Sequence, residues 1–431
     1  MTRVAQRTVG LGAVALVVVA TALDLPIHHP GHAETRLVLA VLGYSAFAVV
    51  LVVHHVRPFL TRRLVLGAVL VLLTVAVALP PRSSRDVWSY AMYGRAVSVH
   101  HESPYTVDPD DFRGDPMLSR VSPRWREQPS VYGPVFVGVA AGITAVTGAS
   151  PLATRLGFQL LAALLALTVL LMIGRVTGDP AAMAWFGLNP MIAFFVVNEG
   201  HNDLMVGAAI LGAVLLAERR PGRAGALVGL AGLVKVAGLL ALPALAVSMA
   251  RRLGMRAGAA VLAAGAGVAV GGYLVVGWGG LMPLRAASQW HTPASLASAI
   301  LAVDPRVHAV VFTELLVGLA VMVHLRRGMT DSVWLVGVVV TTYLLAAPYV
   351  LPWYFAWVLP VAALAWRSRL AILLAVQTAV FAVISVDSRT VTPEGLHDAL
   401  STATHWLLPV LEVAALAVLV ATRRPRRRAV A

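Results

Sequence analysis

Residues 86–112 read DVWSYAMYGRAVSVHHESPYTVDPDDF, and after a further polar run residues 130–134 read SVYGP. This stretch is the only long polar segment between apolar runs of the sequence, and it is rich in Asp, Arg, His and Tyr. The rest of the chain reads as hydrophobic helices joined by short connectors. We therefore expect an all-α fold whose helices hold residues 81–152 as an active-site loop with interfacial helices on the outer face of a membrane.

The composition indicates a polytopic integral membrane protein. Of the 431 residues, 59% are hydrophobic and 13% are charged, whereas soluble domains have roughly 45–50% apolar and about 25% charged residues. The chain has no Cys, which excludes disulfides, thiolate metal sites and thiol nucleophiles. The formal net charge of +14 would suggest nucleic-acid binding in a soluble protein, but here the basic residues flank apolar runs, so no nucleic-acid partner is expected.

Apolar runs recur along the whole chain, and most approach the length needed to cross about 30 Å of hydrocarbon. They occupy residues 9–23, 37–53, 64–79, 135–146, 153–173, 181–197, 204–217, 224–250, 257–276, 307–323, 333–347, 355–366, 371–386 and 406–421. The first run is interpreted as an uncleaved helix rather than a signal peptide. Because no internal repeat or linker divides the sequence, residues 1–431 are predicted to form a single membrane domain.

Clusters of arginine orient these runs, because positive charges near helix ends are retained in the cytoplasm. Arginines at 3–7, 57–63, 219–223, 251–256, 326–327, 367–369 and 423–428 are assigned to the inside, which requires an even number of crossings. Residues 135–146 should therefore lie at or dip into the outer interface. Residues 224–250 should form a hairpin broken near Lys235, with a single tilted helix as the alternative. The result is about 14 crossings, cytoplasmic termini and an extracytoplasmic polar loop after the third span.

Asp86 is the first candidate for chemistry, because it follows the third apolar run almost at once. A carboxylate at the boundary between water and lipid is partly desolvated and can act as a general base toward a lipid-borne substrate. The alternative is that Asp86 caps an interfacial helix that starts at VWSYAMYGR. Position alone does not separate the base from the cap.

Other polar side chains of this segment allow two interpretations each. Tyr90 suits an interfacial anchor as well as a substrate contact. Arg95 offers a fork of donors to a phosphate, and it can equally pair with Asp86 or Glu102. The acidic run at 108, 110 and 111 lacks a full coordination-loop pattern, so a solvated turn is favoured over a cation site and no metal is predicted.

The run NEGHND, residues 198–203, lies between two apolar runs. His201, Asn202 and Asp203 would stand at a helix N-terminus, where free N–H groups attract an anion such as a donor phosphate. Simple capping by Asn202 or Asp203 is the alternative. Lys235 lies alone inside an apolar run, which marks either a functional cavity or a side chain that reaches back to the interface.

The last candidate is the run APYVLPWYFAW, residues 347–357. Its aromatic side chains suit a headgroup belt and also suit stacking on a sugar face. Residues 278–306, with Trp290 and His291, and the loop containing Arg389 can also line a site, but nothing in the sequence narrows their role.

These pieces, in this order, resemble the polytopic glycosyltransferases of the C-type superfamily, which use lipid-phosphate sugars. Within that superfamily, the sequence most resembles the bacterial polyprenyl-phosphomannose-dependent α-1,6-mannosyltransferases of lipomannan assembly and their family relatives. The resemblance rests on DVWSYAMYGR with SPYT, on VYGP, on GHNDLM, on AGLVK and on PWYFAWVLP, and it spans roughly residues 86–360. The run HHES at 100–103 replaces the Gly-containing run expected before Pro-Tyr, so the acceptor and the sugar stay open.

The resemblance implies an outward-facing site in which Asp86 acts as base on an acceptor hydroxyl while basic groups bind the donor phosphate. Since a polyprenyl phosphate is already a good leaving group, no second carboxylic acid and no cofactor are expected. The implied partners are a polyprenyl-phosphate sugar, a glycan or glycolipid acceptor of the cell envelope, and membrane lipid. The substrate-binding residues implied are Tyr90, Arg95, Tyr105, Tyr132, His201, Asn202, Asp203, Lys235, Trp353 and Tyr354.

Two other functions remain open from the sequence. A transporter or flippase of a lipid-linked sugar should show paired repeats and ionisable groups near the bilayer midplane, whereas here the polar groups are predicted on one face. A noncatalytic relative that acts as an assembly partner is the other alternative.

Overall fold

The computed structural model describes residues 2–27, 32–288, 290–292, 295–296, 309–386 and 394–421. Every regular element in these ranges is helical, which confirms the all-α class. The α-helices are α1 (Arg3–Asp24), α2 (Ala33–Val56), α3 (Arg62–Ala78), α4 (Asp86–Ser98), α5 (Pro134–Thr147), α6 (Pro151–Thr177), α7 (Pro180–Gly187), α8 (Asp203–Leu216), α9 (Pro221–Gly232), α10 (Ala241–Leu253), α11 (Met255–Val276), α12 (Met282–Ala287), α14 (Ala309–Arg326), α15 (Ser332–Ala346), α16 (Leu359–Ala363), α17 (Arg369–Ile384), α18 (Glu394–Thr402) and α19 (Leu408–Ala421). Short 3-10 or π-helical turns are η2 (Pro109–Phe112), η3 (Leu118–Arg120), η4 (Pro123–Trp125), η5 (Ile192–Val197), η6 (Val236–Leu240), η7 (Trp278–Gly280), η8 (Pro352–Trp357) and η10 (Ala403–Leu407).

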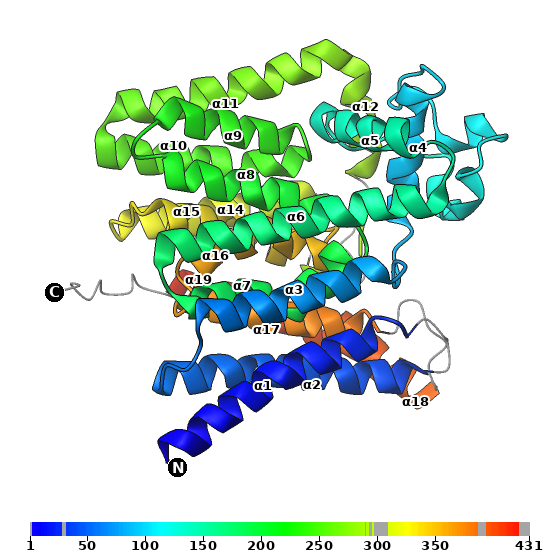
Figure 1. The fold of residues 1–431 in the computed structure, drawn as a ribbon. Helices are drawn as coiled ribbons and strands as arrows, with labels where there is room; N and C mark the ends of the chain where they lie inside the picture. The colour runs from blue at the N-terminus through cyan, green and yellow to red at the C-terminus, as the bar shows by residue number, and fades with distance from the viewer. Residues whose placement is uncertain are drawn as a thin grey trace.

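The long helices share a common direction, and the polar segment lies at one end of them. Figure 1 shows α1, α2, α3 and α6 running along the same axis, with α4, α5 and the loops between them at the right-hand end. The start of α1 lies at the opposite end. Helices α1 and α2 pack together, as do α4 and α5 and the layered group α8, α9 and α11. The fold therefore presents the polar segment as one end of a helical bundle.

Six helices are long and apolar enough to cross a membrane in the described part of the chain. They are Val4–Asp24, Ala33–Val56, Pro151–Thr177, Val236–Leu253, Met255–Val276 and Gly395–Ala421. Several other apolar runs form helices of 10–17 residues, among them Pro134–Thr147 and Asp203–Leu216. The membrane-type helical fold is thus confirmed in its coarse form, while the count of 14 crossings, the interfacial place of α5 and the side of each loop stay predictions.

Among the predicted apolar runs, residues 181–197 and 224–250 do not form continuous α-helices. Pro190 follows the end of α7, and Asn189 satisfies the interrupted backbone by accepting the amide of Met191 at 3.0 Å. In the second run α9 ends at Gly232 and Lys235 has an extended backbone (φ −140°, ψ 131°) before η6 begins. The predicted break near Lys235 is therefore confirmed, and the alternative of one continuous tilted helix is wrong.

The polar segment between α3 and α5 is ordered by its own small core. Met92, Met117, Leu118 and Val121 bury one another under partly exposed aromatic rings. The carboxylate of Asp115 fastens this layer to α4. The segment is thus a folded platform rather than a loose loop, which allows it to hold side chains at fixed positions.

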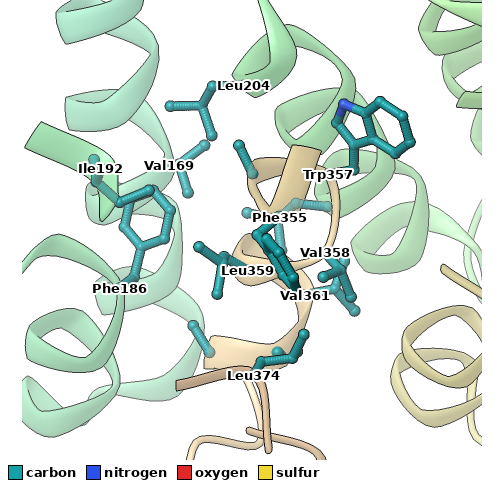
Figure 2. Packing of buried hydrophobic residues seen from close by; sticks show 14 of the residues in the cluster. Val169, Phe186, Ile192, Leu204, Phe355, Trp357, Val358, Leu359, Val361 and Leu374 are labelled. Atoms are coloured by element: carbon teal, nitrogen blue, oxygen red, sulfur yellow. The ribbon is translucent and has the colours of Figure 1, made fainter. Parts of the chain in front are cut away.

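The main core lies below this platform, where the second half of the chain packs on the first. Figure 2 shows Phe355 and Leu359 of the η8–α16 region facing side chains such as Val169 of α6 and Leu204 of α8. Because lipid tails are as apolar as these side chains, close van der Waals packing rather than removal from water stabilises this core. This packing fixes η8, and with it Trp353, against the start of α8.

Candidate active site

Asp86 is the first residue of α4 and faces a cavity. Arg85 is the N-cap residue and makes no side-chain cap hydrogen bond, so the alternative that Asp86 caps the helix is wrong. The Asp86 amide donates to Oγ of Ser84 at 3.1 Å, which fixes the first turn. The Asp86 side chain retains 19% of its exposure. The carboxylate is therefore partly desolvated yet reachable, as a general base requires.

His201 stands directly behind Asp86. Its Nε2 lies 3.4 Å from Oδ2 of Asp86, and its Nδ1 bonds the carbonyl oxygen of Phe195. Because a carbonyl can only accept, Nδ1 carries a proton, so Nε2 approaches the carboxylate favourably only when one proton lies between them. The ring is fully buried and stacks on Trp353 with 3.9 Å between centroids. His201 and Asp86 thus form a close pair, although Nε2 makes no hydrogen bond to any described residue.

Lys235 is bound to the buried carboxylate of Asp203. Its Nζ lies 2.7 Å from Oδ1 of Asp203, which also accepts the indole N–H of Trp357 at 2.7 Å. The ammonium sits over the rings of Tyr354 and Tyr132, at 4.6 Å and 5.4 Å from their centroids. The positive charge of Lys235 is therefore compensated inside the fold.

Asn198 and Glu199, the first residues of NEGHND, anchor the loop that carries Asp86, a role that was not predicted from the sequence. Glu199 accepts the amide and hydroxyl of Ser83 at 2.9 and 2.6 Å, and also the amide of Ser84. Asn198 accepts the amide of Arg82 at 2.8 Å and donates to the carbonyl of Pro80 at 3.0 Å. A buried acid between two apolar runs is costly unless it is hydrogen-bonded, so the position of Glu199 in the sequence already indicated a structural role.

At the N-terminus of α8, where an anion site was predicted, the polar side chains contact other protein groups. The helix starts at Asp203, and Asn202 occupies the cap position without a side-chain cap hydrogen bond. Both residues are buried, and Asp203 faces Lys235 instead of the helix amides. Neither residue lines the cavity in front of Asp86. Capping through the side chain of Asn202 or Asp203 is therefore wrong.

An aromatic cavity of about 190 Å³ opens in front of Asp86. We call it the aromatic cavity, and its lining includes Asp86, Tyr93, Trp125, Tyr132, Lys235, Trp290, Tyr343, Tyr349, Trp353, Tyr354 and Trp357. Burial and then the Asp86 carboxylate raise the pKa of Tyr132 well above its usual value, so its phenol stays a neutral donor. Flat aromatic walls with a few polar groups suit the apolar face of a sugar ring.

A second hollow of about 350 Å³ adjoins the aromatic cavity, and we call it the junction cavity. Asp86, Trp125 and Trp353 line both spaces. The junction cavity adds polar groups, including Arg85, Arg124 and His291. Asp86 thus lies where an aromatic space meets a polar one.

The structure does not bring every predicted residue to this cavity. Arg95 is buried, and its Nε pairs with Asp115 at 2.7 Å while Nη1 donates to the carbonyl of Gly148 at 2.7 Å. Its partner is therefore neither Asp86 nor Glu102. Tyr90 packs in an aromatic cluster with its ring centroid 6.4 Å from that of His201. Tyr105 is buried too, and neither tyrosine lines the cavity.

The structure places some of the remaining candidate residues. Asp108 and Asp111 form a reciprocal capping box around η2, which accounts for the acidic turn. Across the described residues no group of three His, Asp or Glu side chains is arranged to hold a metal ion. Trp290 lines the aromatic cavity and His291 the junction cavity. Arg389 and the basic tail at 423–428 lie outside the described residues.

Comparison with known proteins identifies relatives in one family. Residues 3–251 match the family model described as alpha-(1->6)-mannopyranosyltransferase, N-terminal domain. Alpha-(1->6)-mannopyranosyltransferase A of Corynebacterium glutamicum is 32% identical over 146 residues, which cover 32% of this chain and 29% of that protein. The protein of the same name from Mycobacterium tuberculosis is 33% identical over 148 residues, covering 32% and 28%.

A further relative, alpha-(1->6)-mannopyranosyltransferase B of Corynebacterium glutamicum, is 31% identical over 180 residues, covering 36% of this chain and 29% of that protein. The aligned parts therefore span less than a third of each relative. No solved structure matches the chain. Because the family model covers more than half of the sequence, from the first helix to the end of α10, this chain belongs to the alpha-(1->6)-mannopyranosyltransferase family.

Proposed function

We propose that this protein is a membrane glycosyltransferase that moves mannose from a polyprenyl-phosphate sugar to an envelope glycan or glycolipid. The single observation that carries the proposal is the place of Asp86: a partly exposed carboxylate, 3.4 Å from His201, between an aromatic cavity and a polar one. The family supplies the sugar, since the relatives are named as mannosyltransferases.

The proposed reaction is one displacement. Asp86 accepts the proton of the acceptor hydroxyl while the oxygen of that hydroxyl forms a bond to the anomeric carbon. The bond from that carbon to the phosphate oxygen breaks, and the polyprenyl phosphate leaves with the electron pair. His201 lies behind Asp86 and influences its protonation. Trp353 and Tyr354 stack on the sugar. Lys235 and Asp203 hold the aromatic wall in place.

We also propose that the site faces outward in a multi-pass cell-membrane protein with cytoplasmic termini. The Ala78 end of α3 leads into the polar segment, so its arginine-rich start at Arg62 lies at the other end of the bundle. The chain has no Cys, so single cysteines can report sidedness. Arg113→Cys should react with an impermeant thiol reagent in intact cells, and Arg223→Cys only after lysis.

The test of function supplies radiolabelled polyprenyl-phosphate mannose to membranes with and without the protein. We expect a new mannosylated product that disappears in Asp86→Asn. It should be retained in Asp110→Asn, which removes a half-buried acid of the same segment that lines none of the cavities. Removal of a general base should lower the rate by about 10²–10⁴-fold. Near-normal transfer by Asp86→Asn would remove that residue from the mechanism, and movement of intact lipid-linked sugar without bond formation would favour a flippase.

A further inference from the structure

A third hollow, separate from the aromatic cavity, lies beside the loop that carries Asp86. It has a volume of about 810 Å³ and lies between residues 80–85, Trp88 of α4 and the start of α6. Four arginines line it: Arg82, Arg85, Arg120 and Arg155. We call it the arginine groove. No carboxylate is part of its described lining.

The positive charge of this groove is only partly compensated. Arg82 pairs with the buried carboxylate of Asp24 at 2.5 Å. Within the described residues, Arg85, Arg120 and Arg155 form no ion pair with a carboxylate. Three guanidinium groups around one hollow, without an acid, favour an anion with several acceptor oxygens.

Two of these guanidinium groups are held in place by neighbours that leave donors available. Arg120 lies over the indole of Trp88, 5.0 Å from its centroid. Arg155 donates from Nη1 to the carbonyl of Leu79 at 2.5 Å and to Oε1 of Gln159 at 3.0 Å. Arg85 is exposed at the cap of α4. The groove is therefore partly preorganised by cation–π stacking and by the end of α3.

The rim of the groove is apolar and continues along a helix. Leu152, at the start of α6, lines the groove and is exposed. Leu160, Leu164 and Leu171 of the same helix are exposed too. These four positions fall within one side of an α-helix. Because α6 is a candidate membrane span, this uncovered stripe offers a surface for a lipid chain that leads up to the arginines.

The groove also reaches the candidate active site. Ser83 and Arg85 line both the arginine groove and the junction cavity, which Asp86 lines as well. In contrast, Lys235, which lines the aromatic cavity, is compensated by Asp203. An anionic group beside Asp86 therefore finds free positive charge on the side of Arg85 and not on the side of Lys235.

We propose that the arginine groove binds the phosphate of a lipid substrate, with Arg85 and Arg120 as its principal ligands and the lipid chain along α6. This inference rests on the proposed function only for the identity of the lipid, a polyprenyl phosphate. It places the phosphate on the polar side of Asp86 and leaves the aromatic cavity to the sugar. Arg155 supports the end of α3, so its replacement would change both phosphate binding and the stability of the fold.

The test measures binding without any transfer step. The full chain is placed in nanodiscs of neutral lipid, and the probe is a polyprenyl phosphate without sugar. The double variant Arg85→Gln and Arg120→Gln should bind at least tenfold more weakly, because each charged hydrogen bond contributes roughly 1.5–3 kcal/mol. The matched control is Arg113→Gln, an exposed arginine of the same polar segment that lines none of these hollows.

Unchanged binding in the double variant would overturn the inference, as would an equal loss in Arg113→Gln. A second arm uses inorganic phosphate as competitor. If it displaces the probe at concentrations comparable to the lipid, the groove is a site for free phosphate and the lipid assignment is wrong. The outcome is independent of catalysis, since wild-type protein that binds the lipid but transfers no mannose would contradict only the proposed function.

Discussion

Nε2 of His201 lies 3.4 Å from Oδ2 of Asp86, and the opposite ring nitrogen of His201 is bound to the backbone carbonyl of Phe195. The imidazole is therefore oriented by the backbone of η5, and not by solvent. Stacking on Trp353 removes its remaining freedom. The proposed base thus lies beside a buried imidazole whose orientation is fixed.

Replacement of His201 should separate proton handling from substrate binding. His201→Phe keeps a flat ring against Trp353 but removes Nε2, so we expect kcat to fall by about 10²-fold with little change in the KM for the donor. Initial rates at varied donor concentration measure both. His324→Phe is the control, because His324 is equally buried but lies in α14. Equal losses in the two variants would indicate a general folding defect.

Lys235 should be more important for stability than for donor binding. Lys235→Met leaves the buried Asp203 carboxylate without its cation, which typically costs about 3–5 kcal/mol. We expect a clearly lower unfolding temperature in detergent, restored in part by the double variant Lys235→Met with Asp203→Asn. Arg252→Met, which breaks a pair with the exposed Glu218, should change stability by less than about 1 kcal/mol. An unaltered unfolding temperature with a raised donor KM would instead make Lys235 a phosphate ligand.

The sequence predicted the all-helical, membrane-type fold and the break near Lys235, because both depend on local composition and on Arg placement. The side of the membrane on which the polar segment lies stays a prediction. The sequence also singled out residues that meet at one site: Asp86, His201 and Trp353. The sequence did not predict which charged side chains form ion pairs with one another. Which carboxylate neutralises which cation depends on how distant helices pack, and several partners were open to each charge.

Arg95 and Lys235 illustrate this limit. Arg95 was open to a phosphate, Asp86 or Glu102, and Lys235 to a functional cavity or the interface, whereas the structure gives each a buried acid partner, Asp115 and Asp203 respectively. The groups that line the arginine groove were unremarkable in the sequence because Arg85, Arg120 and Arg155 come from three separate elements. Only the fold brings them to one hollow.

Glu199 should act on catalysis through the loop that carries Asp86. Glu199→Gln keeps the shape but removes the charge that receives three hydrogen bonds from Ser83 and Ser84. We expect a loss of stability of about 1–3 kcal/mol and roughly tenfold lower kcat with a similar KM. Glu218→Gln, an exposed acid, is the control. A normal kcat would show that the loop keeps Asp86 in place without this carboxylate.

Asp115 should make the polar platform sensitive to acid. Burial alone would raise its pKa, but hydrogen bonds from the Met117 amide, His100 and Arg95 outweigh it and hold the pKa below the usual 3.8. Since the folded pKa lies below the unfolded one, the carboxylate stabilises the fold fully above about pH 4, and this contribution is lost as pH falls through the folded pKa. Unfolding temperatures measured in detergent between neutral and strongly acidic pH should therefore decline for the wild type.

In Asp115→Asn the unfolding temperature at neutral pH should be lower, because Arg95 loses its buried acid partner, and its decline toward acid should be shallower. Asp110→Asn removes an acid whose pair with Arg113 is exposed, so the wild-type profile should be retained there. An acid profile that stays as steep in Asp115→Asn as in the wild type would show that other carboxylates set the acid limit of this platform. A neutral-pH unfolding temperature unchanged by Asp115→Asn would mean that Arg95 is held by the Gly148 carbonyl alone.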